Sequence, residues 1–209
     1  MMKTKNKIEL ITSYLDEILP NVGCELHYTK DYELVIAVML SAQTTDVSVN
    51  RVTDVLFSRY SSLEEMDNAR LEDIEEIIHS IGLYKNKAKH VLEITNKILN
   101  DFGGKVPSDK DLLQTLPGVG NKTAGVIRAE IFKIPDLPVD THILRISKRL
   151  GLAKEKDDAY ATEMKLKKLF PEDRWIKTHH QLIHFGRYRC TARNPECENC
   201  KLAGICTKK

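Results

Sequence analysis

Two side chains near the middle of the sequence have the types that covalent catalysis needs. Lys122 follows the glycine-rich stretch Leu116–Gly120, and Asp140 lies eighteen residues further on. A lysine amine that is partly neutral can act as a nucleophile and form a Schiff base. A carboxylate can accept a proton from such an amine and stabilise positive charge on the reacting group. Taken alone, such a lysine more often holds a phosphate, and such an aspartate more often caps a helix.

The stretch around Lys122 has the pattern of two helices joined by a tight turn. Pro117 cannot continue the first helix, and Gly118 and Gly120 permit a left-handed backbone or the close approach of another molecule. A second helix that begins after Gly120 points its unpaired amides and positive dipole end out of the turn, where they can bind a phosphate. The same dipole favours the neutral amine of Lys122. An ordinary turn between two helices is the alternative for a bare GxG.

Four of the five cysteines fall within the last twenty residues. Their spacing is Cys190-x6-Cys197-x2-Cys200-x5-Cys206, and Cys24 stands apart from them. In an intracellular chain such a cluster favours a metal over disulfides. Four thiolates suit either a [4Fe–4S] cluster or a tetrahedral zinc ion, although zinc sites more often use two close CxxC pairs.

Helical periodicity dominates the remaining sequence, and no alternating strand pattern is present, so we expect an all-α fold. The apolar run Leu34–Leu40 is expected to be a buried core helix. Asp46 is expected to cap the next helix, and Ser108, with Asp111 three residues on, resembles a capping box. The pattern predicts further helices at 69–80, 84–101, 121–133, 140–150, 158–170 and 173–186.

Composition indicates a globular protein. Charged residues make up 30% and hydrophobic residues 42% of the 209 residues, and no apolar run approaches the length that spans a bilayer. The net charge of +2 is small, but the C-terminal end is basic and could face phosphates. Against two glutamates it carries seven cations: Lys177, Arg187, Arg189, Arg193, Lys201, Lys208 and Lys209. We expect a monomer in the cytoplasm, with no membrane partner.

Several of these stretches resemble one known family. LPGVGNKTA, at 116–124, resembles the helix-hairpin-helix of the endonuclease III family of DNA glycosylases, whose usual form is LPGVGRKTA, and VDTHILR, at 139–145, resembles its VDTH segment. The resemblance implies that Lys122 is the catalytic nucleophile and Asp140 the catalytic carboxylate. Asn121 replaces a cation, which predicts a weaker phosphate contact but keeps the backbone site. The cysteine spacing matches the iron–sulfur loop of the family and therefore favours a [4Fe–4S] cluster.

Two further segments resemble the parts of this family that read a lesion. They are LSAQTTD, at 40–46, and GLY, at 82–84, in which Gln43 and Leu83 occupy the matching positions. An enzyme that flips a base out of a duplex fills the gap left behind, and a glutamine can bond the orphaned base while a leucine wedges the stack. The predicted DNA-binding residues are Gln43, Leu83, Gly118, Val119, Gly120 and His142.

By resemblance, the chain has two helical domains. One spans 24–134 and carries the helix-hairpin-helix at 112–133, and the other combines 1–23 with 135–209 and the cluster loop at 190–206. DNA is expected in the groove between them, associating the protein with the nucleoid. The expected activity is that of a bifunctional glycosylase and AP lyase of base excision repair. It removes oxidised or ring-saturated pyrimidines from duplex DNA through a Schiff base on Lys122 and cleaves the strand 3′ to the abasic site by β-elimination.

Two alternatives remain beside this interpretation. A mismatch-directed glycosylase could use the same fold, but the adenine-specific members are hydrolytic and lack the lysine found here at Lys122. A non-catalytic DNA-binding module could use the hairpin and the cluster only to hold duplex. It would form no covalent intermediate, and the presence of both Lys122 and Asp140 argues against it.

Overall fold

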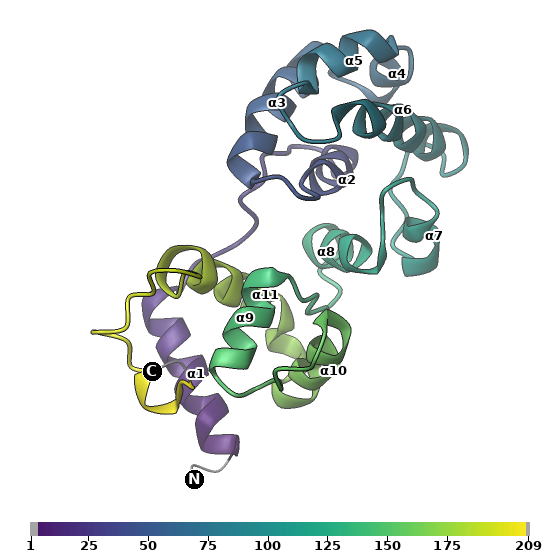
Figure 1. Cartoon of the computed structure of the whole chain (residues 1–209). Coiled ribbons are helices and arrows are strands. Elements are labelled where there is room, and N and C mark those ends of the chain that lie inside the picture. The colour runs from purple at the N-terminus through teal and green to yellow at the C-terminus, as the bar shows by residue number, and fades with distance from the viewer. Residues whose placement is uncertain (1–3, 208–209) are drawn as a thin grey trace. The chain divides into compact units, whose positions relative to one another are not determined.

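The computed structural model describes residues 4–207, and every regular element in that range is a helix, as the sequence predicted (Figure 1). The chain divides into two compact units. One is Glu25–Phe132, and the other combines Met1–Cys24 with Lys133–Lys209. Over residues 4–207, no helix combines the length and the apolar character needed to cross a bilayer.

The unit Glu25–Phe132 is built around the helix predicted from the apolar run. Nine consecutive residues of this helix, α2, are buried from Tyr32 to Leu40, and α2 packs against α3, α6 and α8. Other helices surround it. Among these, α5 packs on α3 and α6, and α7 packs on α8. The helices of this unit are α2 (Asp31–Leu40), α3 (Asp46–Arg59), α4 (Leu63–Asp67), α5 (Leu71–Ile78), α6 (Tyr84–Asn100), α7 (Lys110–Gln114) and α8 (Asn121–Phe132).

Two predicted helix caps in this unit are wrong by one residue. Thr45, not Asp46, caps α3, because the Thr45 hydroxyl accepts from the N–H of Ser48. Asp109, not Ser108, caps α7, and its carboxylate accepts from two N–H groups of the first turn at 2.9 Å. In both cases the capping residue has the extended backbone that aims its side chain at the first turn.

The other unit joins the N-terminal helix to the C-terminal third of the chain. Its core contains Ile11 and Leu15 of α1 with Ile143 and Ile146 of α9 and Leu182 of α11. The predicted helix at 173–186 is three consecutive pieces, η1, α11 and the π-helical η2. The elements are α1 (Thr4–Ile18), α9 (Thr141–Arg149), α10 (Ala159–Leu169), η1 (Glu172–Arg174), α11 (Trp175–His184), η2 (Phe185–Arg189) and η3 (Ala203–Ile205).

The carboxylate of Asp16 connects α1 to η1 and α11. Both oxygens of Asp16 accept from the guanidinium of Arg174, at 3.0 and 3.1 Å, and one of them also contacts Lys177 Nζ at 2.8 Å. The side-chain amide of Gln181 donates to the same oxygen at 2.9 Å. These contacts hold the two ends of the chain in one unit (Figure 1).

Candidate active site and metal loop

Lys122 is exposed in the first turn of α8, directly after the tight turn that the sequence predicted. The turn closes through an N–H···O bond from Val119 to Leu116, and α8 opens with a bond from the N–H of Ala124 to Gly120 O. The N–H groups of a helix's first turn have no partner within the helix, so they point out of its end. The Lys122 amine therefore extends from an element that itself attracts anions.

Gly118 and Gly120 of the hairpin differ in how strongly the structure requires a glycine. Gly118 has φ +74°, and a Cβ there would lie 2.9 Å from Met39 Cγ and 3.0 Å from His90 Nδ1. The hairpin thus rests on α2 and α6 at a point where only glycine fits. Gly120 has no positive φ, and a Cβ there would meet nothing within 4 Å. Within residues 4–207, neither the backbone conformation nor a neighbouring atom requires glycine at this exposed position.

The side chain of Val119, a residue predicted to bind DNA, lies in the protein interior. Its side chain is buried, and its N–H is already bonded within the turn. Neither group is available to a ligand, because the side chain belongs to the core that supports the hairpin.

Asp140 is the N-cap of α9, as its position in the sequence suggested. One carboxylate oxygen, Oδ1, accepts from the N–H of Ile143 at 2.7 Å, and the residue is half-buried. Among the contacts of residues 4–207, capping uses only this oxygen, so the second oxygen can serve a reacting group. Asp140 belongs to the unit that contains Lys133–Lys209, whereas Lys122 belongs to Glu25–Phe132.

His142 lies where α9 meets η2. A Cβ on Gly186 would lie 2.9 Å from the Cβ of His142, so glycine permits this close packing. The guanidinium of Arg145 lies 3.4 Å from His142 Nδ1 and donates to Gly186 O at 2.7 Å. These contacts give His142 a structural role at the start of α9, next to Asp140.

Gln43 and Leu83 share an uncommon backbone conformation. Their φ angles are +56° and +59°, and only one other non-glycine residue among 4–207, Lys133, has a positive φ. Both side chains are exposed, Leu83 by 65%, which is high for a large apolar residue. Left-handed backbone at such residues costs of order 1–3 kcal/mol and is commonest at functional sites. The two residues that the family resemblance proposed as lesion readers therefore share a strained backbone and an exposed side chain.

Sequence reasoning missed three cations that hydrogen-bond to predicted functional segments, one to the loop of Gln43 and two to the cysteine loop. Lys87 is buried in α6 and donates to the loop that carries Gln43. Arg145 and Arg149 of α9 reach the start of the cysteine loop. The sequence carries a weak signal for each, since Lys87 falls among the apolar positions of α6, and Arg145 and Arg149 are four residues apart on one face of α9.

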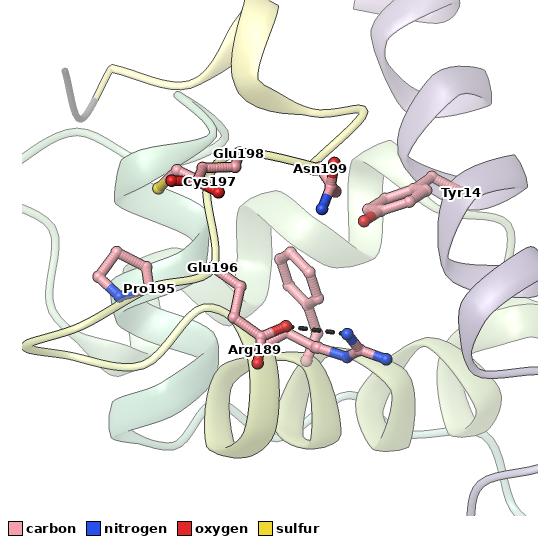
Figure 2. A pocket seen from close by; sticks show the side chains of 8 residues that line it. Tyr14, Arg189, Pro195, Glu196, Cys197, Glu198 and Asn199 are labelled. Carbon is pink, nitrogen blue, oxygen red and sulfur yellow. Dashed lines mark hydrogen bonds and ion pairs between the residues drawn. The ribbon is translucent and has the colours of Figure 1, made fainter.

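Residues 195–199 of the cysteine loop line one side of a pocket of about 390 Å³ beside α1 (Figure 2). The ring of Tyr14 points toward it from α1, with Cys197 and Glu198 on the loop and the Arg189–Glu196 ion pair, 2.8 Å, below them. All five cysteines lie within the described residues, and none forms a disulfide.

Two sulfur atoms of the loop, those of Cys190 and Cys200, receive hydrogen bonds from their surroundings. Arg149 Nη1 donates to Cys190 Sγ at 3.1 Å, and the Tyr14 hydroxyl and the N–H of Leu202 bond the sulfur of Cys200. Burial, with the nearby Cys190 and Cys197, raises the pKa of the Cys200 thiol, so a thiolate there needs a compensating cation. Hydrogen bonds to thiolates are typical of the protein shell around iron–sulfur clusters.

The donor set of the loop fits an iron–sulfur cluster, for which four cysteine thiolates are the usual ligands. Across residues 4–207, no three His, Cys, Asp or Glu side chains converge closely enough to hold one metal ion. The thiolates of a [4Fe–4S] cluster each bind a different iron, so they surround a volume and do not meet at one point. Cys190, Cys197, Cys200 and Cys206 would hold such a cluster, which would tie the C-terminal loop to α1 and α9.

Part of the positive charge of the C-terminal end is neutralised by carboxylates of the same protein. Three of its cations form ion pairs, Lys177 with Asp16, Arg189 with Glu196, and Lys201 with Glu17 at 2.6 Å. Arg193 is exposed, and Lys208 and Lys209 lie outside the described residues. The tail is therefore a weaker candidate for a phosphate-facing surface than its composition suggested.

Comparison with known proteins agrees with this geometry. Residues 36–172 match the HhH-GPD superfamily of base excision DNA repair proteins, and residues 190–206 match the iron–sulfur binding domain of endonuclease III. Endonuclease III of Bacillus subtilis is 44% identical over 98% of this chain and 94% of its own length. Endonuclease III of Escherichia coli is 38% identical over 100% of this chain and 98% of its own length.

Solved structures give the same result. A trapped endonuclease III–DNA covalent intermediate has a TM-score of 0.93 and 42% identity, covering 99% of this chain and 97% of that one. A thermostable thymine-DNA glycosylase, at 24% identity and a TM-score of 0.82, shares the fold. The cofactor is an iron–sulfur cluster. Fold, cysteine loop and relatives together place the chain in the endonuclease III family of base excision DNA repair enzymes, which are DNA glycosylases with AP lyase activity.

Proposed function

We propose that this enzyme binds duplex DNA and removes oxidised or ring-saturated pyrimidines through a Schiff base on Lys122, then cleaves the strand by β-elimination. A trapped covalent complex with DNA is known for a relative 42% identical to this chain. The observation that carries the proposal is the position of Lys122, an exposed amine in the first turn of α8.

The hairpin anchors DNA through its backbone. The first turn of α8 offers N–H groups and a positive dipole end to one phosphate, and neither depends on the base sequence. Gly120 leaves room for the phosphate to approach, since no side chain stands there. Such an anchor suits an enzyme that must test every position of a duplex for damage.

The reaction proceeds in two stages. Lys122 Nζ attacks C1′ of the damaged nucleotide, the glycosidic bond breaks, and the base leaves with the bonding electrons and a proton. Asp140 stabilises the positive charge on the sugar and accepts the proton that the amine loses, which can pass to the departing base. The sugar ring then opens at the C1′–O4′ bond, O4′ takes up a proton, and the nitrogen becomes doubly bonded to C1′ as an imine. The imine makes the C2′ proton acidic, and loss of that proton expels the 3′ phosphate with the electrons of the C3′–O bond, which cleaves the strand 3′ to the lesion.

Borohydride trapping tests the covalent step. Sodium borohydride reduces an imine to a stable amine, so wild-type enzyme should become linked to a duplex that contains thymine glycol or an abasic site. Lys122→Gln keeps a similar length and polarity but has no nucleophile, so we expect binding without linkage. Lys105→Gln is the matched control, because Lys105 is an exposed lysine of the same unit outside the hairpin.

Each result decides between mechanisms. Linkage that disappears only in Lys122→Gln supports the proposal. Base release by the wild type without any linkage would mean that water is the nucleophile and that the enzyme is a hydrolytic glycosylase. Linkage that persists in Lys122→Gln would place the nucleophile on another amine.

A further inference from the structure

Lys87 is an unusual residue for its place in the fold. Its side chain is buried in α6, and its ammonium donates to three oxygens, Leu40 O at 2.8 Å, Ala42 O at 2.8 Å and Thr44 Oγ1 at 2.9 Å. An ammonium has three donors, so all are used. None of the three partners is a carboxylate, and burial lowers the pKa of Lys87 without an opposing anion.

Such a buried cation is a costly way to stabilise a fold. Removing an ammonium from water carries a large desolvation penalty, and hydrogen bonds to neutral oxygens offset only part of it. One compensating interaction is the bond to Leu40 O. Leu40 is the last residue of α2, so its carbonyl lies at the negative end of the helix dipole, where a cation is favourable. The other two bonds lie beyond the helix, in the loop, and point to a role in fixing that loop.

The bonds of Lys87 enclose Gln43 from both sides. Ala42 and Thr44, the neighbours of Gln43, both accept from the ammonium. With its two flanking residues held, Gln43 keeps the left-handed backbone, φ +56°, that directs its exposed side chain. Strained backbone of this kind persists only where the surrounding structure fixes it.

Lys87 also lies at the start of the helix that begins after Leu83. Its N–H makes the ordinary first bond of α6, to Leu83 O at 3.0 Å, and Leu83, with φ +59°, is the N-cap. The Lys87 side chain therefore bonds the loop of one strained, exposed residue to the helix that begins after another, forty residues away in the sequence. We propose that Lys87 is a positioning residue whose ammonium holds Gln43 in the backbone conformation that directs its side chain toward the base stack.

This inference rests on the proposed function and on the lesion-reading role that the family resemblance implies for Gln43 and Leu83. Rigidity matters for that role because side chains that are already ordered lose less entropy when they replace a flipped base. Binding to undamaged duplex uses the hairpin and should not depend on Lys87. The effect of Lys87 should therefore appear in the preference for damaged over undamaged DNA.

The test uses Lys87→Met in the full-length protein with its cluster. Methionine has a similar length but donates nothing, and Lys97→Met is the matched control, because it removes the same charge from the far end of α6. The measurement is the ratio of affinities for a duplex with a tetrahydrofuran abasic analogue and for the undamaged duplex. We expect Lys87→Met to lower this ratio on the order of tenfold, a size usual for coupled neighbours, with undamaged-duplex affinity unchanged.

A double-mutant cycle separates positioning from general stability. If Lys87 acts through Gln43, then Gln43→Ala with Lys87→Met should lose no more preference than Gln43→Ala alone. Additive losses, or equal weakening of both duplexes, would overturn the proposal. Thr44→Val removes one acceptor of the ammonium with little change in shape, so it supplies the same test, with a smaller loss, if Lys87→Met folds poorly.

Amide hydrogen exchange without DNA makes the inference independent of the proposed function. Exchange across residues 41–45 should be faster in Lys87→Met and in Thr44→Val than in the wild type, and unchanged in Lys97→Met. Unchanged exchange in the first two variants would refute the role of Lys87. If exchange is faster but Gln43→Ala and Leu83→Ala keep the wild-type preference, the positioning of the loop stands and the proposed lesion-reading role of these residues fails.

Discussion

At the scale of single residues, the carboxylate of Asp140 combines its capping role with a proposed catalytic role. Capping of α9 uses Oδ1, whose bond to the N–H of Ile143 is 2.7 Å long. The proposed catalytic role uses the negative charge of the whole group. A cap can be neutral, whereas stabilisation of a cationic sugar requires the charge, so one substitution can separate the two roles.

We predict that Asp140→Asn lowers turnover on the order of a hundredfold or more, as expected when a catalytic charge is lost, with little change in melting temperature. Asparagine keeps the shape and the capping oxygen. Asp158→Asn is a matched control, because Asp158 caps α10 of the same unit with the same 2.7 Å geometry. Single-turnover base release measures the first effect and calorimetry the second. A lower melting temperature with an unchanged rate would reduce Asp140 to a cap.

At the scale of elements, the hairpin between α7 and α8 is held by its fit against neighbouring helices. Gly118 has both a left-handed backbone and a close contact with Met39 and His90. Gly120 has neither constraint and lies exposed at the start of α8. The same substitution at these two positions should therefore have different consequences.

We predict that Gly118→Ala destabilises the protein by about 1–3 kcal/mol, because alanine is strained at positive φ and its Cβ displaces Met39. Gly120→Ala should leave unfolding unchanged and weaken binding to damaged and undamaged duplex alike. Urea unfolding and binding titrations at two salt concentrations measure these effects. If Gly120→Ala instead changed only the lesion preference, the hairpin would not be the backbone anchor.

The packing of α1 on α11 gives a prediction about pH. Arg174 above all, with Lys177 and Gln181, holds the pKa of Asp16 well below its usual range. An unfolded aspartate titrates near pH 3.9, so the stabilisation from Asp16 is complete above about pH 5 and is lost as the pH falls below 3.9.

Asp16→Asn should therefore be less stable than the wild type at pH 6. The difference should begin to shrink as the pH falls from about 4 to 3, because the unfolded aspartate then binds a proton while the folded one stays charged. Melting temperatures across this range provide the measurement. Glu17→Gln is the control, since Glu17 forms an exposed pair with Lys201 and exposed pairs contribute little. A stability difference that stays constant down to pH 3 would mean that Asp16 acts by shape and not by charge.

At the scale of the whole molecule, the cluster belongs to one unit. All five cysteines lie in the unit that combines Met1–Cys24 with Lys133–Lys209. Its loop has little regular structure beyond the short η3, so the folding of the loop depends on the bound metal.

We predict that Cys197→Ser lowers iron content below the about four per chain of a full cluster and speeds amide exchange across residues 190–206. Exchange in Glu25–Phe132, which contains no cysteine, should not change. Cys24→Ser should keep the iron, because Cys24 is outside the loop. A colourless, active protein with one zinc ion per chain would refute the cluster.

The sequence by itself determined the features that depend on neighbouring residues. Helical periodicity, the Pro117–Gly120 turn, the cap at Asp140 and the cysteine spacing are all local, because a helix or a short metal loop is specified within a few residues. Cap positions at Thr45 and Asp109 were missed by one residue, since several polar residues compete at each helix start and backbone geometry selects one.

Only the tertiary structure decided what distant residues do to one another. Lys87 reaches loop residues that are 45 and 43 positions away, and Met39 and His90 of other helices leave no room for a side chain at Gly118. Val119 was assigned to DNA by its motif, yet the fold buries it. Periodicity shows which face of a helix is apolar but not which partner that face meets. The positive φ angles of Gln43 and Leu83 likewise arise from contacts that no local pattern contains.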